Sequence, residues 1–417
     1  MNSIVLSNVS VSFGKRDVLK GINFEVTEGK VKVISGFSGS GKSTLLRTIS
    51  GVIPEVMSVQ VNGDVTPSSV RERKSILSYV PQEPWFSVVT PYVWSEIYSF
   101  SSRGYEDHIE SMVRELRLDK LLYRTTFTLS AGELQRVAIA SSVASGKSVI
   151  LLDEPTSHLD PSNAGKVVSL VKYFKKLGVG FVITDHNLDL WRGLGDEFYY
   201  LNEGSLQNGI PSYYQEVSDE LDSLSPPDPS EEVVLEVQVK EYRYPDSDRP
   251  ILEDVSLNVR KGEIVAVVGP SGGGKSTLLR LIASRSRISS GTISVKAKGK
   301  IAYIPDNPLL FFSGSTLRKE LENKENGLMK KFGLSHLLDT PIKFLSVGER
   351  RRAALLSALT REAKVILLDE PTIGLDPKNK LSVLETVASI AQRGVSFIIA
   401  SHDPAVKRVS NEVLTIE

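Results

Sequence analysis

The stretch GFSGSGKSTLLR, Gly36 to Arg47, occurs again almost unchanged as GPSGGGKSTLLR, Gly269 to Arg280. Each copy matches the phosphate-loop pattern G-x-x-x-x-G-K-[ST], in which glycines let backbone N–H groups converge on one anion. One such match could be a chance Gly-rich turn, but both copies follow a β-rich run and precede a leucine-rich segment. The sequence therefore predicts two nucleoside triphosphate sites in one chain.

The residues of each loop have defined roles in this pattern. Lys42 and Lys275 would reach the β- and γ-phosphates, and the hydroxyls of Ser43 and Ser276 would bind Mg²⁺. The helix that begins there adds its positive dipole end. Further contacts with ATP are expected from the remaining glycines and hydroxyls of the loops, namely Gly36, Ser38, Gly39, Gly41, Thr44, Gly269, Ser271, Gly272, Gly274 and Thr277.

The repeat extends over both halves of the chain. Asp153 and Asp369 are separated by 216 residues, whereas Lys42 and Lys275 are separated by 233. The second half therefore lacks 17 residues between its phosphate loop and its later motifs, where insertions belong to loops or peripheral helices. Because 417 residues are enough for two domains with their own cores, we expect one domain per repeat.

An acidic stretch rich in Pro and Ser marks the boundary between the halves. It predicts a linker at 218–232 between a first domain at 1–217 and a second at 233–417. The chain has 50 basic and 50 acidic residues, so its charge does not indicate a nucleic-acid-binding protein. It has no cysteine, which excludes disulfides, thiolate zinc sites and iron–sulfur clusters.

No apolar run is long enough to span a bilayer, and the polar start MNSIVLSNVS lacks the features of a signal peptide. Together with an ATP site, these features predict a cytoplasmic location.

Each half contains the run VILLDE, a buried strand that ends in two carboxylates. Parallel strands of α/β proteins end at the ligand crevice, so Asp153 and Asp369 are expected to hold Mg²⁺. Glu154 and Glu370 follow directly and could polarise the water that attacks the γ-phosphate. An acidic turn capping a core strand is the alternative, but the phosphate loop upstream in both halves argues against it.

Two further motifs recur at matched positions. LSAGE and LSVGE place Ser130 and Ser346 at a helix start, where an ordinary capping box is the alternative to ligand binding. The position just before VILLDE in both halves favours ligand binding. His186 and His402 follow a later strand in each half and are expected to donate to a γ-phosphate oxygen.

Together these motifs resemble the ATP-binding cassette (ABC) family over nearly the whole chain. The resemblance implies an α/β fold with two tandem P-loop domains, each with a mainly parallel sheet, an antiparallel β subdomain and a helical subdomain. It also implies ATP hydrolysis with ATP and Mg²⁺. The resemblance implies that Gln82 is the Q-loop glutamine and a Mg²⁺ ligand, and that Asp160 and Asp376 are the D-loop aspartates. It also implies that Phe13 and Tyr244 are the rings that stack on adenine, with Tyr242 as the alternative to Tyr244.

In this family two cassettes pack head to tail, and each ATP lies between one phosphate loop and the opposite signature. The resemblance implies that this chain supplies both cassettes. One site would combine the first phosphate loop with Ser346 and Gly348, and the other would combine the second loop with Ser130 and Gly132.

The second half departs from the family pattern at the Q-loop. Aligning YVPQEP with YIPDNP puts Asp306 in the place of Gln82. An aspartate could still bind Mg²⁺, but its charge would face the γ-phosphate. We therefore expect the second site to hydrolyse ATP more slowly than the first.

The segments after the Q-loops resemble those of energy-coupling factor transporters, where a Phe/Leu-rich piece docks a membrane subunit. Five apolar residues would form this docking surface, with a place in the core as the alternative: Trp85, Phe86, Leu310, Phe311 and Phe312.

The expected function is that of an ATPase subunit on the inner face of the cell membrane, which powers a separate transmembrane protein in the uptake of a vitamin or a metal ion. No nucleic-acid partner is expected. The alternatives are a soluble tandem cassette acting on ribosomes, a DNA-repair cassette and a sugar-type importer subunit. The short linker argues against the ribosomal class, the lack of coiled-coil or zinc insertions against DNA repair, and the short chain against the sugar importer.

Overall fold

The computed structural model describes residues 3–14, 16–57, 59–101, 106–157, 159–245, 249–270, 272–284, 293–321 and 327–416. The chain divides into two compact units, Met1–Gln215 and Glu216–Glu417. Among the described helices, no segment has the length and apolar character that crossing a bilayer requires.

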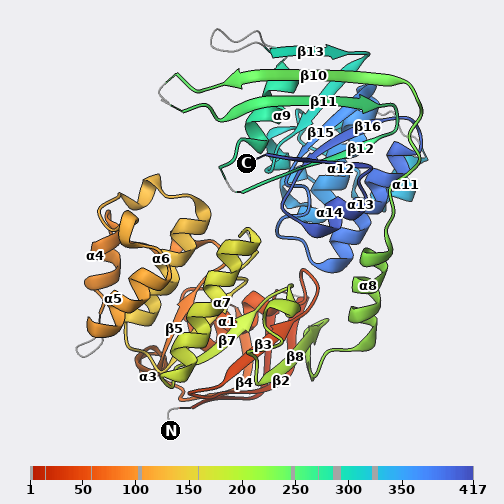
Figure 1. The fold of residues 1–417 in the computed structure, drawn as a ribbon. Helices are drawn as coiled ribbons and strands as arrows, with labels where there is room; N and C mark the ends of the chain where they lie inside the picture. Colours follow the sequence, from red (N-terminus) through yellow and green to blue (C-terminus); the bar gives the residue numbers. More distant parts are fainter. Residues whose placement is uncertain are drawn as a thin grey trace. The chain divides into compact units, whose positions relative to one another are not determined.

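The first unit combines a mainly parallel sheet, an antiparallel sheet and a helical lobe. The main sheet has the order β5-β6-β7-β3-β8-β9, parallel except for β9, and the second sheet has the order β2-β1-β4. Figure 1 shows α4, α5 and α6 gathered in one lobe, drawn in orange. The strands are β1 (Ile4–Phe13), β2 (Arg16–Val26), β3 (Val31–Ser35), β4 (Gln60–Thr66), β5 (Leu77–Val80), β6 (Val149–Asp153), β7 (Gly180–Thr184), β8 (Glu197–Asn202) and β9 (Ser205–Asn208). The helices are α1 (Lys42–Ser50), α2 (Val52–Glu55), α3 (Val70–Ile76), α4 (Val93–Tyr98), α5 (Glu106–Glu115), α6 (Ala131–Ala144) and α7 (Pro161–Lys176).

The second unit repeats this design. Its parallel sheet has the order β14-β15-β16-β12-β17, and its antiparallel sheet has the order β11-β10-β13 (Figure 1). The strands are β10 (Val233–Tyr242), β11 (Leu252–Arg260), β12 (Ile264–Val268), β13 (Ile293–Ala297), β14 (Lys300–Ile304), β15 (Ala363–Asp369), β16 (Ser396–Ala400) and β17 (Glu412–Thr415). The helices are α9 (Lys275–Ser284), α10 (Leu317–Glu320), α11 (Leu328–Lys331), α12 (Val347–Thr360), α13 (Pro377–Ala391) and α14 (Pro404–Arg408). The expected fold class is confirmed in both units.

The parallel sheet of the first unit is covered on both faces, and successive side chains of a strand point to opposite faces. In β6, Ile150 and Leu152 belong to the core that contains α6 and α7. Val149 and Leu151 belong to the core that contains α1 and the antiparallel sheet. All five residues of β6 are therefore buried, including Asp153 at its acidic end.

The shorter second half omits part of the peripheral structure. In the first unit, α3 lies between β4 and β5. In the second unit, β13 and β14 are joined directly through Lys298 and Gly299. The stretch expected as a linker begins within helix α8 (Ser212–Ser223), in which Tyr214 packs into the core of the first unit and Leu221 into that of the second.

Candidate active sites

The first phosphate loop connects β3 to α1. Gly36 has φ 155°, and a Cβ there would lie 2.3 Å from the carbonyl oxygen of Leu201, so only glycine fits. The Lys42 ammonium donates to the carbonyl of Gly36 at 2.9 Å. Gly41 provides no side-chain cap to α1, which leaves the N–H groups of its first turn available to a phosphate. The predicted contacts Ser38, Gly39 and Thr44 lie in this loop and the first turn of α1.

The second phosphate loop has the same construction between β12 and α9. Gly269 has φ 158°, and a Cβ there would lie 2.2 Å from the carbonyl oxygen of Ile416. Lys275 donates to the carbonyls of Gly269 and Pro270 at 3.0 and 2.9 Å. Ser271 lies outside the described residues. The other predicted contacts, Gly272, Gly274 and Thr277, lie in the loop and the first turn of α9.

A buried carboxylate meets the loop hydroxyl in each unit. In the first, Ser43 donates to Asp153 at 3.2 Å, and Tyr79 and Thr184 donate to the same carboxylate at 3.0 and 2.8 Å. Burial raises the pKa of Asp153 despite these hydrogen bonds. A cation at this place would relieve the cost of burying its charge.

In the second unit Asp369 accepts from Ser276 at 2.9 Å and from Tyr303 at 3.0 Å. Burial likewise raises the pKa of Asp369. A hydroxyl and a carboxylate are oxygen ligands that fit Mg²⁺, which is commonly bound by one or two carboxylates together with substrate phosphates. Among the described residues, no group of three or more His, Cys, Asp or Glu side chains is placed to hold a metal ion.

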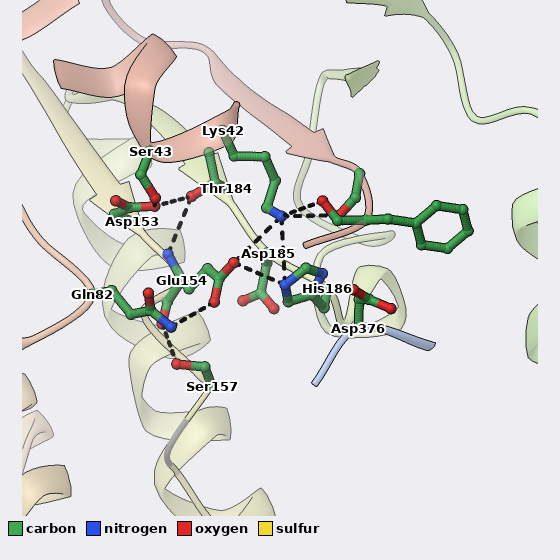
Figure 2. A network of polar contacts seen from close by, with 12 residues as sticks. Lys42, Ser43, Gln82, Asp153, Glu154, Ser157, Thr184, Asp185, His186 and Asp376 are labelled. Atoms are coloured by element: carbon green, nitrogen blue, oxygen red, sulfur yellow. Dashed lines mark hydrogen bonds and ion pairs between the residues drawn. The ribbon is translucent and has the colours of Figure 1, made fainter. Parts of the chain in front are cut away.

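Glu154 is held by three donors, as Figure 2 shows. Its Oε1 lies 2.8 Å from Nε2 of His186 and 3.4 Å from the Lys42 ammonium, and its Oε2 accepts from the Gln82 amide at 2.8 Å. Burial acts to raise the pKa of Glu154, but the hydrogen bond and charge of His186 and the charge of Lys42 outweigh it and lower the pKa to about 2. The carboxylate is therefore ionised.

Glu370 has a different set of partners. His402 contacts its Oε1 through Nδ1 at 3.0 Å, and Ser401 donates to its Oε2 at 3.0 Å. Asp306, at the position of Gln82, is exposed and accepts from the backbone N–H of Asn307 at 2.8 Å. Burial acts to lower the pKa of His402, but the hydrogen bond and charge of Glu370 raise it overall.

The two signature serines cap helices. Ser130 begins α6 and Ser346 begins α12, each in a capping box with the glutamate three residues later. The structure thus contains the capping box that was the alternative for these motifs. Gly132 and Gly348 lie in the first turns of these helices, and a Cβ on Gly348 would lie 2.5 Å from Asn379 Oδ1. Asp160 and Asp376 are the N-caps of α7 and α13.

The predicted adenine-stacking rings are partly exposed. Phe13 ends β1, and Tyr244 follows β10 with its hydroxyl 2.9 Å from that of Thr277 in the phosphate loop helix. Tyr242, the competing ring, is buried. Because a stacking ring must be accessible, exposure favours Tyr244 over Tyr242.

The predicted docking residues separate into two groups. Trp85, Phe86 and Leu310 are 54%, 73% and 76% exposed, which excludes a place in the core. Phe311 and Phe312 are half-buried and pack against the core of the second unit.

The two tyrosines whose hydroxyls donate to Asp153 and Asp369 were not identified from the sequence. Tyr79 and Tyr303 stand at the same place in YVPQEP and YIPDNP. Each lies three residues before Gln82 or Asp306, and this repeated position is the sequence feature from which their role could have been predicted.

Strand order, phosphate loops and paired carboxylates define a tandem P-loop ATPase. The sequence profile of the ABC transporter family matches residues 19–157 and 252–373. The chain belongs to this family, as the motifs predicted, and is an ATP hydrolase.

Several relatives span nearly the same length. A putative ABC transporter ATP-binding protein of Sulfurisphaera tokodaii is 31% identical, with 92% of this chain and 89% of the relative covered. A putative HMP/thiamine import ATP-binding protein of Bacillus subtilis is 27% identical, with 93% and 84% covered.

Solved structures show the same fold. The RNase-L inhibitor aligns with a TM-score of 0.72 at 22% identity, covering 99% of this chain and 87% of that one. The archaeal ribosome recycling factor aABCE1, solved with ribosomal stalk protein aP1, aligns with a TM-score of 0.74 at 22% identity, covering 98% and 87%. At this identity the likeness concerns the fold alone.

Proposed function

We propose that the chain is the ATP-hydrolysing subunit of a membrane transporter and acts from the inner face of the cell membrane. A separate membrane protein would form the solute path, and uptake of a vitamin or a metal ion is the reaction that we favour. The relatives include a protein named as a putative HMP/thiamine import ATP-binding protein, which supports a role in transport.

One observation carries this proposal. Gln82 donates to Glu154, and the 3₁₀ turn Pro84–Phe86 that follows it presents Trp85 and Phe86 to solvent. A segment of five residues thus joins the glutamate of the first site to an exposed aromatic surface. A partner bound to Trp85 and Phe86 would sense the state of that site through Gln82.

The residues have distinct roles in the proposed reaction. Lys42 would bind the β- and γ-phosphates, Ser43 and Asp153 would hold Mg²⁺, which neutralises phosphate charge, and Glu154 would orient a water for attack on the γ-phosphorus. The new P–O bond forms from water as the bond to the β-phosphate oxygen breaks, and the water proton passes to Glu154 or to a phosphate oxygen. Lys275, Ser276, Asp369 and Glu370 would act alike in the second unit.

ATP itself would prepare Glu154 for this role. A carboxylate with a pKa of about 2 is a weak base because His186 and Lys42 stabilise its charge. The γ-phosphate would compete with Glu154 for His186 and for Lys42. Once they bind phosphate oxygens, Glu154 regains basicity and is free to contact water.

The family resemblance supports a pairing in which each phosphate loop faces the signature of the other cassette. Ser346 and Gly348 would complete the first site, and Ser130 and Gly132 the second. ATP binding would close the pair, and hydrolysis would reopen it.

The docking surface can be tested by pull-down from membranes. Trp85→Ser combined with Phe86→Ser should abolish recovery of hydrophobic partners with the full chain. It should shift Tm by about 2 °C or less, because both side chains are exposed. Val56→Ser is the matched control, because Val56 lies elsewhere in the first unit and is 75% exposed. It should change neither the recovery of partners nor the Tm.

Two outcomes would contradict the proposal. A large fall in Tm would mean that Trp85 and Phe86 support the fold rather than a partner. Co-sedimentation of the chain with ribosomes, without any membrane partner, would favour a soluble cassette that acts on ribosomes.

A further inference from the structure

The two glutamates share an unusual backbone conformation. Glu154 has φ 47° and Glu370 has φ 45°, in the left-handed region that residues other than glycine rarely adopt. Each lies at the end of its strand, where its N–H donates to a neighbouring strand, to Thr184 at 2.9 Å and to Ala400 at 2.8 Å. Such a conformation persists only when surrounding contacts hold it.

The carbonyl of each glutamate is held by a different side chain. In the first unit the hydroxyl of Ser157 donates to the Glu154 carbonyl at 3.0 Å. In the second unit the matching residue is Ile373, which has no donor, and the Arg351 guanidinium donates to the Glu370 carbonyl instead. Arg351 also donates to the carbonyl of Ile373 at 3.1 Å, so it connects both ends of this turn.

The position of Arg351 is occupied differently in the first unit. Gln135 stands there, is buried, and neither its amide nitrogen nor its amide oxygen has a partner among the described residues. The turn itself is alike, since the N–H groups of Ser157 and Ile373 donate to the glutamate carbonyls at 3.3 and 3.4 Å. The pair Gln135 and Ser157 thus corresponds to the pair of Arg351 and Ile373.

Arg351 also brings a charge to the second site. Burial lowers the pKa of Arg351 to about 10, against the opposing charges of Glu370 and Asp306. The guanidinium therefore stays protonated at neutral pH. In the first unit the positive charge beside the glutamate comes from Lys42 at 3.4 Å.

We propose that Ser157 and Arg351 are positioning residues that fix the backbone of the catalytic glutamate. Ser157 does so for Glu154 in the first cassette, and Arg351 does so for Glu370 in the second. This inference rests on the proposed role of Glu154 and Glu370. It predicts that the two arrangements are interchangeable, so that a serine at position 373 makes Arg351 dispensable.

The test uses the full chain and measures kcat, the KM for ATP and Tm. Arg351→Gln in a chain that carries Glu154→Gln should lower the remaining kcat about tenfold, with KM within about twofold, because one hydrogen bond from a charged donor is lost. Adding Ile373→Ser should restore most of the rate. Arg352→Gln, which removes a neighbouring guanidinium that bonds to the Phe332 carbonyl, is the matched control.

The reciprocal exchange tests the first unit. Ser157→Ala in a chain that carries Glu370→Gln should lower kcat, and adding Gln135→Arg should restore it. If either glutamate substitution alone stops turnover, the sites are coupled, and Arg351→Gln must then lower the rate of the otherwise unaltered chain by the same factor.

Two results would overturn the inference: an unchanged kcat in Arg351→Gln, or a double variant with Ile373→Ser that is no faster than Arg351→Gln alone. A merely structural role for Arg351 would lower Tm without rescue of kcat by the serine. The proposed role of the glutamates would fail separately, if Glu154→Gln combined with Glu370→Gln left hydrolysis unchanged.

Discussion

Replacing the two glutamates with glutamine is expected to affect ATP hydrolysis unequally. Gln82 donates to Glu154 at 2.8 Å, whereas Asp306 at the matching position accepts from the N–H of Asn307. A hydrogen bond to a charged group contributes about 1.5–3 kcal/mol. Because Gln82 is half-buried, we take the lower end as the amount by which an amide that positions the glutamate lowers the activation free energy. A difference of this size predicts a first site about tenfold faster than the second.

This ratio predicts how the activity divides between the sites. If the sites turn over independently, Glu370→Gln should retain about 90% of the rate and Glu154→Gln about 10%. Asp306→Gln should raise the remaining rate of the Glu154→Gln chain, because it supplies the missing amide donor to Glu370.

The assay is phosphate release by the full chain at saturating MgATP. Glu236→Gln, at an exposed carboxylate on β10 paired with Lys296, is the control and should leave the rate unchanged. Equal losses in Glu370→Gln and Glu154→Gln would contradict a difference in rate between the two sites. So would an Asp306→Gln variant without any gain.

Two further predictions concern stability. Burial acts to lower the pKa of His402, but Glu370 raises it above its value in the unfolded chain. Protonated His402 therefore stabilises the folded state fully below about pH 6.5, and this stabilisation is lost as the pH rises through the folded pKa. The Tm advantage of the wild type over His402→Gln should therefore shrink between pH 6 and 8.5 in thermal scans, and a constant difference would contradict this. Gly348→Ala should lower the free energy of unfolding by about 1–3 kcal/mol in urea titrations, because its Cβ would lie 2.5 Å from Asn379 Oδ1. Gly132→Ala should cost less, since the nearest atom there is a flexible leucine methyl at 3.0 Å, and equal losses would argue against a steric cause.

The fold and the arrangement of the phosphate loops could be predicted from the sequence because both depend on local patterns. A loop such as Gly36 to Lys42 determines its own conformation through its glycines. VILLDE is apolar at every position up to its carboxylates, which predicts a buried strand with an acidic end. Both features occur in each half of the chain, so each copy supports the interpretation of the other.

Contacts between distant segments could not be predicted in this way. The hydroxyl of Tyr79 reaches Asp153 only because β5 and β6 pair in one register, which no local pattern specifies. The same holds for Arg351, which looked like one of three arginines in a helix and reaches Glu370 across the packing of α12. The sequence identifies Asp306 as a departure from the family pattern, but only the structure shows that Asp306 accepts a hydrogen bond from the N–H of Asn307.

The presence of two ATP sites in one chain is tested most directly by the number of ATP molecules that each chain binds. A chain with both Glu154→Gln and Glu370→Gln should retain ATP without hydrolysing it, and equilibrium dialysis with labelled ATP and Mg²⁺ would then count the sites. We expect two ATP per chain, and one after either Lys42→Ala or Lys275→Ala. A single site in the double glutamate variant, or full binding after a lysine substitution, would contradict it.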